Sequence, residues 1–200
     1  MDRKDVKILE NKDLYNGFFH MRRYRLRHRT FEGCWSGTLS REVFERDPCA
    51  AVIPYDPVRD EVALIEQFRP GPMAAGHNTP WTIEIVAGIL ENDETPEELA
   101  FRETKEETGG TLSELAHICN FFTSPGGSTE FCHLYCGRID TREIGGIFGN
   151  TDEGEDIRVF TESAREAFAR IERSEIESAF SIIALQWLIL NRESLRERWT

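Results

Sequence analysis

The sequence has few cysteines, and their spacing offers neither a disulfide framework nor a thiolate metal site. Five cysteines occur among the 200 residues, and no pair is spaced as Cys-x-x-Cys. Cys132 and Cys136 fall in a predicted strand, where their separation places them about 13 Å apart, too far for a disulfide. We therefore expect buried, reduced thiols, as is usual in the cytoplasm.

The sequence also lacks a long apolar run and an apolar leader. The longest apolar run, residues 181–190, is too short for a membrane-spanning helix, which needs about 20 residues. Residues 1–13 are rich in charge and contain no apolar segment typical of a secretion signal. These absences predict a cytoplasmic protein that does not bind membranes.

Basic residues are the minority among the charged ones. The sequence contains 24 lysines and arginines against 36 aspartates and glutamates, which gives a net charge of −12. This balance argues against nucleic acid as the partner, because the phosphate backbone is also negative. An acidic protein that acts on an anionic substrate must bring positive charge to its site, and metal ions bound by carboxylates would supply it.

The chain contains strand and helix patterns typical of an α+β domain. Residues 1–48 show long extended patterns without a helical period, which predict an N-terminal unit of antiparallel strands. Residues 49–200 are expected to form the main domain. Its strands are predicted at residues 49–55, 61–69, 81–86, 112–122 and 131–139, with loops at 70–80 and 145–154. Helices are predicted after Thr95, after Ser163 as far as about Glu172, and from Ser174 or Glu175 onward.

The first of these helices has clear start and stop signals. Thr95 suits the N-cap, Pro96 suits the first helical position, and Glu98 completes a capping box. Gly109 and Gly110 are expected to end the helix. Because these signals set where the helix begins and ends, the helical period determines which of the residues between them lie on the same face.

Three glutamates share one face of this helix. Glu103, Glu106 and Glu107 are spaced i, i+3 and i+4, which places their Cβ atoms about 5–6 Å apart. Carboxylates so close repel one another unless a cation lies among them, and oxygen ligands alone favour Mg²⁺ or Mn²⁺. Arg102 precedes Glu106 by one turn and can hold its carboxylate. For the glutamates taken alone, a solvated helix face is the alternative.

The glutamates belong to a longer pattern that begins at Gly88. Residues 88–110 read GILENDETPEELAFRETKEETGG, which is similar to the signature of the Nudix hydrolase family, G-x5-E-x7-R-E-U-x-E-E-x-G-U, where U is aliphatic. Every Gly, Glu and Arg of the signature is present, whereas Thr104 and Gly110 replace the two aliphatic residues. Because Gly88 lets the backbone approach the site, the carbonyl of Ala87 would be a further oxygen ligand.

The resemblance implies a fold and a reaction. The fold is α+β, with a mixed β-sheet sandwiched between helices, here preceded by an antiparallel β appendage. The reaction is hydrolysis of a pyrophosphate bond with Mg²⁺, for which Mn²⁺ can substitute. Arg102 and Glu106 then count among the catalytic residues.

A second segment narrows the resemblance to one branch of the family. Residues 124–130 read SPGGSTE, with Pro125 sixteen residues after Gly109, and this loop is similar to that of the bacterial ADP-ribose pyrophosphatases. The GDP-sugar hydrolases of the family carry a similar loop. Further segments that look like this branch are residues 31–33, 56–62, 65–67, 155–159 and 184–188. The branch implies cleavage of ADP-ribose to AMP and ribose 5-phosphate by a homodimer whose N-terminal strands exchange between subunits.

The same branch assigns roles in substrate binding. Phe18 would stack on adenine, with Arg41 on its other face, donated by the partner subunit. Arg46 and Arg69 would meet the phosphates or the ribose. Taken alone, Phe18 is equally an ordinary core aromatic, and Arg41 and Arg46 are solvated charges. The remaining substrate-binding residues are Gly127 and Glu130.

The general base is expected on an acidic loop, residues 149–156, which lies close behind two glycines. A loop can open and close the site, which favours it as the position of a base. The resemblance to the branch places the base at Glu153, with Glu155 as the rival. Without the resemblance, a solvated loop is the simpler interpretation.

Two other functions fit the same residues. The first is hydrolysis of a different nucleoside-diphosphate sugar, such as GDP-mannose. The second is a non-catalytic Nudix-fold sensor that binds a nucleotide. Retention of every glutamate of the signature favours an enzyme over the sensor.

Overall fold

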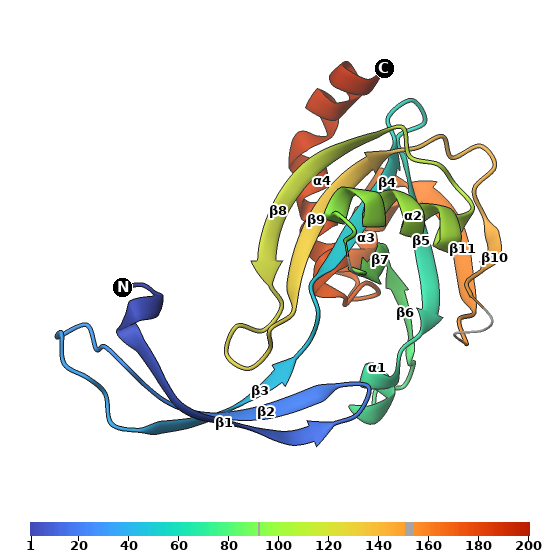
Figure 1. Ribbon diagram of the computed structural model, residues 1–200. Coiled ribbons are helices and arrows are strands. Elements are labelled where there is room, and N and C mark those ends of the chain that lie inside the picture. Colours follow the sequence, from blue (N-terminus) through green and yellow to red (C-terminus); the bar gives the residue numbers. More distant parts are fainter. Residues whose placement is uncertain (92, 151–153) are drawn as a thin grey trace. The chain divides into compact units, whose positions relative to one another are not determined.

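The computed structural model describes residues 1–91, 93–150 and 154–200. The chain forms two compact units, Met1–Pro48 with Phe121–Phe131 and Cys49–Asn120 with Cys132–Thr200. Residues 121–131, which we expected in the main domain, thus pack with the N-terminal residues. Figure 1 shows the elements of both units.

The first unit contains a three-stranded antiparallel sheet in the order β1-β2-β3. A short 3₁₀ turn, η1 (Arg3–Asp5), precedes β1 (Val6–Asn16), β2 (His20–His28) and β3 (Leu39–Glu45). The expected antiparallel appendage is therefore confirmed. Every residue of β1 is exposed.

The second unit is built on a mixed eight-stranded sheet. The strand order is β10-β11-β5-β4-β9-β8, with β6 paired to β5 and β7 paired to β4. The pair β4–β9 is parallel, and the other registered pairs of this sheet are antiparallel. The strands are β4 (Cys49–Asp56), β5 (Glu61–Phe68), β6 (Trp81–Glu84), β7 (Val86–Ile89), β8 (Glu114–Phe122), β9 (Phe131–Arg138), β10 (Gly146–Phe148) and β11 (Ile157–Ser163).

Helices cover both faces of this sheet, with α2 (Pro96–Thr108) on one face and α3 (Ala164–Glu172) and α4 (Ala179–Trp199) on the other (Figure 1). The central strand β4 is buried along its whole length, as a strand covered on both faces must be. The expected mixed sheet between helices is confirmed.

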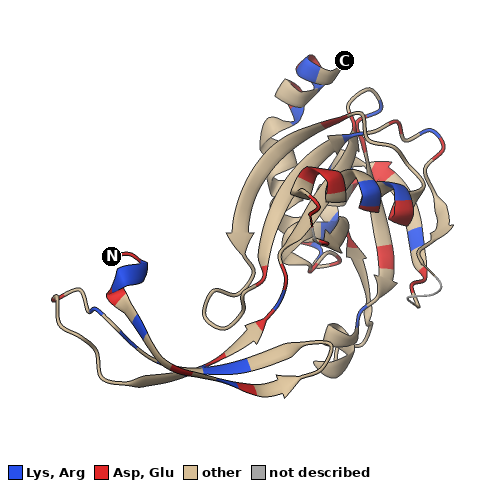
Figure 2. Cartoon of the chain, in the orientation of Figure 1, with Lys and Arg blue, Asp and Glu red and all other residues tan. Residues whose placement is uncertain are grey.

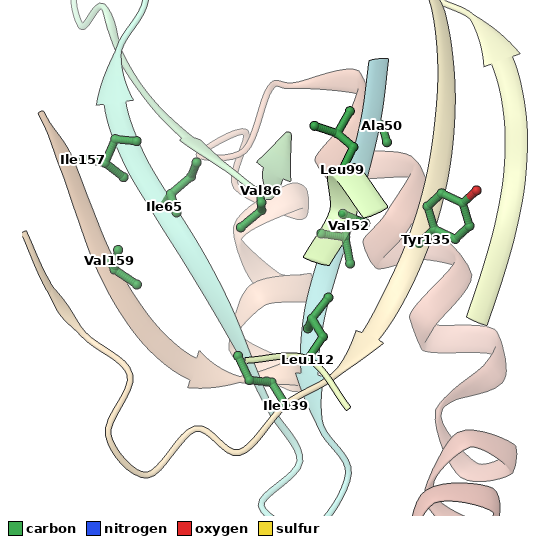
Figure 3. Close-up of a cluster of buried hydrophobic side chains, with 11 residues drawn as sticks. Ala50, Val52, Ile65, Val86, Leu99, Leu112, Tyr135, Ile139, Ile157 and Val159 are labelled. Atoms are coloured by element: carbon green, nitrogen blue, oxygen red, sulfur yellow. The ribbon is translucent and has the colours of Figure 1, made fainter. Parts of the chain in front are cut away.

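Apolar side chains fill the space between the sheet and α2. Leu99 on α2 packs with residues of β4, β5, β7, β9 and β11 (Figure 3). The buried cluster consists of Ala50, Val52, Ile65, Val86, Leu99, Ala100, Leu112, Tyr135, Ile139, Ile157 and Val159. On the opposite face, Ser181 of α4 accepts a hydrogen bond from the buried amide of Ile85 (3.0 Å) between β6 and β7. Together these contacts hold α2 against the sheet, where Glu103 and Glu107 lie beside β7.

Two helix predictions were wrong. The proline-rich segment predicted as a loop contains a short helix, α1 (Pro70–Ala74), because Pro70 can occupy a first helical position. The last helix begins after Ser178 rather than at Ser174 or Glu175. Ser174 has a left-handed φ of 57° and Glu175 pairs with Arg170 and Arg173, so both residues close α3 instead of opening α4. Among the described helices, α4 included, none combines the length and the apolar character that crossing a bilayer requires.

Candidate active site

The ends of α2 are fixed by the signals in its sequence. The Thr95 hydroxyl accepts from the Glu98 amide (3.2 Å), and the Glu98 carboxylate accepts from the Thr95 amide (2.8 Å), so the predicted capping box is confirmed. Gly109 ends the helix with a φ of 70°, and its amide donates to the Lys105 carbonyl. This left-handed conformation favours glycine.

The two departures from the signature have structural reasons. Thr104 is fully buried, and its hydroxyl donates to the Ala100 carbonyl one turn earlier (2.7 Å), so no polar group is left unsatisfied. A Cβ atom at Gly110 would lie 2.5 Å from Cδ1 of Ile139 and 2.7 Å from Cδ1 of Ile144. The site has no room for an aliphatic side chain there, because those isoleucines already fill it.

The carboxylates of Glu103 and Glu107 lie against strand β7. A Cβ atom at Gly88 would come within 2.0 Å of Oε1 of Glu103, so only glycine permits this approach. Oε2 of Glu107 accepts a hydrogen bond from the Ala87 amide (3.3 Å), and Glu107 is only 4% exposed. The side chain of Glu106 is 58% exposed. The helix thus presents one buried, one partly buried and one accessible carboxylate to the same side.

Arg102 connects three carboxylates rather than the one we expected. Its guanidinium forms two hydrogen bonds with Glu94 (2.8 and 3.0 Å), and its Nη1 donates to Glu103 and Glu106 (3.0 Å each). The hydrogen bond from Arg102 lowers the pKa of Glu94. Glu94 therefore serves as an anchor for Arg102, which explains why the signature needs both. Figure 2 shows the acidic and basic segments that alternate along α2.

The buried carboxylates are electrostatically strained. Burial raises the pKa of Glu103 to about 7, and repulsion from Glu106 adds to it despite the nearby Arg102. Burial also raises the pKa of Glu107 well above its ordinary value, and the charges of Glu103 and Glu155 act in the same direction. A cation among these groups would relieve both the burial cost and the repulsion.

The donor set fits a hard divalent cation. Among the residues that the structure describes, the side-chain donors at the site are the carboxylates of Glu103, Glu106 and Glu107, the ligands that Mg²⁺ and Mn²⁺ prefer. Within the described part of the chain, no three His, Cys, Asp or Glu side chains already converge as metal ligands. Nη1 of Arg102 contacts both Glu103 and Glu106 at 3.0 Å. An incoming cation must therefore share these oxygens with the arginine.

Arg69 and Glu155 lie on the same side of the sheet as the glutamates. Arg69, at the end of β5, pairs with Glu84 (2.8 Å), and this pairing raises its pKa against the opposing effect of burial. The charges of Glu107 and Glu155 also act on Arg69. The Glu155 carboxylate accepts from the Asn150 amide (3.0 Å). Glu153, the expected base, lies outside the described residues.

Within the first unit, several of the expected substrate-binding residues gather around Arg46. Its guanidinium pairs with Glu130 (3.1 Å) and lies over the ring of Phe19 (4.8 Å). The ring of Phe18 contacts Phe19 edge-on and is 86% exposed, which contradicts the alternative of an ordinary core aromatic. The carbonyl of Gly127, in the SPGG loop, accepts from the Phe44 amide (2.8 Å).

Arg41 is not part of that group. Its Nη1 donates to the carbonyl of Ser40 (2.8 Å), and the residue is exposed on β3. One group of side chains and backbone therefore contains Arg46, Gly127 and Glu130. Arg41 lies outside this group, and its exposed side chain is accessible to a ligand or another chain.

Several residues of the site were missed by the sequence interpretation. Glu84 pairs with Arg69 from the neighbouring strand, and only the pairing of β5 with β6 brings the two side chains together. Phe19 and Phe44 flank Arg46 across two strands of the first unit. The signature did include Glu94, but its distance from Arg102 along the chain gave no sign that the two side chains meet.

Comparison with known proteins agrees with this arrangement. Residues 45–180 match the family described as NUDIX domain. An ADP-ribose pyrophosphatase of Escherichia coli (strain K12) is 43% identical over 98% of this chain and 94% of the relative. An ADP-ribose pyrophosphatase of Haemophilus influenzae is 38% identical over 98% of this chain and 91% of the relative. A GDP-mannose pyrophosphatase of Cronobacter sakazakii is 32% identical over 93% of this chain and 96% of the relative.

A solved structure shares the fold. The crystal structure of an ADP compounds hydrolase aligns over 100% of this chain and 98% of that chain, with a TM-score of 0.72 and 17% identity. The chain belongs to the Nudix family of hydrolases, as its signature indicated.

Proposed function

We propose that this protein hydrolyses the pyrophosphate bond of ADP-ribose to AMP and ribose 5-phosphate, with Mg²⁺ as cofactor and Mn²⁺ as a substitute. One observation carries the proposal: the complete glutamate set of the signature, three members of which contact Arg102, occurs in a chain that matches ADP-ribose pyrophosphatases over 98% of its length. We also propose that it works in the cytoplasm, where its free cysteines would stay reduced.

In the proposed reaction, the oxygen of a water molecule attacks one phosphorus of the diphosphate. The bond from that phosphorus to the bridging oxygen breaks, and the bridging oxygen leaves with the other phosphate. The cations, held by Glu103, Glu106, Glu107 and the carbonyl of Ala87, would neutralise the diphosphate charge. Glu153 is proposed to take the proton of the water.

The remaining side chains bind and orient. Arg102 keeps the carboxylates of Glu103 and Glu106 directed to one side of α2. Arg69 is proposed to meet a phosphate or the ribose, since it carries a partly exposed guanidinium whose partner Glu84 fixes its direction. Oriented groups of this kind lower the barrier because the substrate is already aligned when the water attacks.

Adenine binding is assigned to the first unit. Phe18 is proposed to stack on the base, because its flat aromatic ring can pack against a purine and is 86% exposed. Arg46, Glu130 and Gly127 are proposed to complete this part of the substrate site, and Arg41 is proposed to reach the other face of the base from a partner subunit.

Product analysis on a small panel of substrates tests the reaction. Incubation with ADP-ribose, GDP-mannose and ADP-glucose should give turnover of ADP-ribose at the highest kcat/KM, with AMP and ribose 5-phosphate as products by ion-exchange chromatography. Reaction in ¹⁸O-water should place the label on one phosphate product only. A higher kcat/KM for GDP-mannose than for ADP-ribose would instead support the second candidate function, hydrolysis of GDP-mannose.

That second candidate, a GDP-mannose pyrophosphatase, is favoured by the relative that is 32% identical over most of both chains. A nucleotide sensor without turnover is the third. Tight binding of ADP-ribose without product would support the sensor and contradict both hydrolases.

We propose a homodimer formed through the N-terminal strands. Phe18, Tyr15 and Phe31 are 86%, 62% and 99% exposed, and every residue of β1 is exposed. Large apolar side chains at such exposure are typical of interfaces. Two other aromatic side chains of this unit are partly covered within the chain: Tyr24 donates a hydrogen bond to Glu45, and the ring of Trp35 is contacted by the cations of Lys7 and Arg29.

Light scattering coupled to gel filtration tests the dimer. The expected mass is twice the chain mass of 23.1 kDa, and activity should fall on dilution below the dissociation constant if the partner subunit donates Arg41. A monomer with full activity would contradict both the exchanged strands and the role of Arg41.

A further inference from the structure

The ring of Phe148 lies directly against the C-terminal end of the glutamate helix. A Cβ atom at Gly109 would lie 2.6 Å from Cε1 and 2.9 Å from Cζ of Phe148. The ring also packs against the apolar cluster beneath α2. Gly109 is therefore required for two separate reasons, its left-handed φ of 70° and the space that the ring occupies.

Phe148 is the only inward anchor of its strand. β10 has three residues, pairs on one side only with β11, and stands at the end of the sheet. Gly146 has no side chain, and Ile147 is 67% exposed. So short an edge strand has few backbone hydrogen bonds to hold it, and the packing of Phe148 adds an attachment to α2 beside the pairing with β11.

The chain that follows Phe148 is fastened to Glu155. Gly149 has a φ of 104°, and a Cβ atom there would lie 2.8 Å from Cβ of Glu155. The Asn150 amide donates to the Glu155 carboxylate and the Glu155 amide donates to the Asn150 carbonyl, both at 3.0 Å. A displacement of Phe148 must therefore be passed on to the Glu155 carboxylate.

We propose that Phe148 is a positioning residue, which through its contact with Gly109 sets the position of the Glu155 carboxylate relative to Glu103 and Glu107. This inference rests on the proposed function, because the glutamates of α2 are its reference point. The place of Glu155 follows from the sheet: it precedes Ile157, which pairs with Phe148 and packs in the same buried cluster as Leu99 of α2.

The test compares Phe148→Ala with Ile147→Ala, which removes an apolar side chain from the same strand but from its exposed face. We expect Phe148→Ala to lower kcat about 10- to 100-fold, because Glu155 follows the proposed base Glu153 by two residues and a shift of about 1 Å at a catalytic group can cost that much. KM should change little, and Phe148→Leu should restore part of the rate because it refills part of the contact. Ile147→Ala should keep the wild-type rate.

A second readout does not depend on turnover. Amide hydrogen exchange at Glu155, followed by NMR, should be faster in Phe148→Ala than in the wild type and unchanged in Ile147→Ala. If the kcat and the Glu155 exchange of Phe148→Ala both match those of Ile147→Ala, the positioning role is wrong. If the wild type hydrolyses no diphosphate but Phe148→Ala still speeds amide exchange at Glu155, the proposed function is wrong. The link between Phe148 and Glu155 would then be upheld.

The contact itself is tested by combining two substitutions. Gly109→Ala should lower the melting temperature more in the wild type than in the Phe148→Ala background, because only the wild type adds the collision with the ring to the backbone strain. Equal shifts in both backgrounds would overturn the contact. Phe148→Leu serves as the background if Phe148→Ala does not fold.

Discussion

Chelation of divalent cations with EDTA is expected to abolish hydrolysis of ADP-ribose, and added Mg²⁺ or Mn²⁺ to restore it. The candidate donors are all oxygens, and the carboxylates of Glu103 and Glu107 are buried beside each other. Without a cation their repulsion is uncompensated and the diphosphate charge is not neutralised. Activity that persists after thorough chelation would contradict the metal site.

The substitution that isolates this site is Glu107→Gln. It keeps the shape of the side chain and removes one ligand charge. We expect kcat to fall at least about 10²-fold, since the charge stabilisation that a metal supplies is worth several kcal/mol. The Mg²⁺ concentration for half-maximal activity should rise as well. Glu193→Gln, at an exposed position of α4, is the matched control and should leave both quantities unchanged.

The stability of Glu107→Gln separates a metal ligand from a structural residue. In the metal-free protein the substitution removes a buried charge that Glu103 and Glu155 repel. The melting temperature of the metal-free variant should therefore equal or exceed that of the metal-free wild type. A large loss of stability would mean that the carboxylate mainly supports the fold.

Glu153→Gln is expected to lower kcat about 10²- to 10⁴-fold, the usual cost of losing a general base. Glutamine keeps the size and hydrogen bonding of glutamate but cannot accept the proton. KM should change little, because ground-state binding is intact. The Mg²⁺ requirement should also be unchanged, which distinguishes this variant from Glu107→Gln.

Glu155→Gln is the control on the same loop and is expected to be milder. If Glu155→Gln were crippling and Glu153→Gln nearly silent, the base would be Glu155. If both were silent, the nearest remaining candidates would be Glu106 and Glu130. The three outcomes are separated by kcat at saturating Mg²⁺.

The glutamate helix could be predicted almost completely from sequence, because its determinants are local. Thr95, Glu98 and Gly109 fix both ends through hydrogen bonds that span three or four residues. Once the ends are fixed, the helical period places Glu103 and Glu107 on one side. The branch of the family was likewise indicated by a short loop of fixed sequence.

What could not be predicted depends on residues that meet only after folding. Arg102 contacts Glu94 because the segment before α2 turns back on the helix, and no helical spacing describes that. Arg69 meets Glu84 because strands β5 and β6 lie side by side in the sheet. The bounds of strand β1 could not be predicted, because neither of its faces is buried within the chain.

The parallel pairing of β4 with β9 has a consequence for how the chain is made. Partners such as Cys49 and Cys132 are joined across the sheet, with β5, α2 and β8 between them in the sequence. Ribosomes add about 5–20 residues per second, so β4, whose residues are all buried in the native protein, must wait several seconds for its partner to be synthesised. Pairings between such distant segments are also slow to form, because a long loop must close first. The nascent chain thus has an interval in which the β9 side of its fully buried strand β4 is open to association with other chains, however stable the finished fold is.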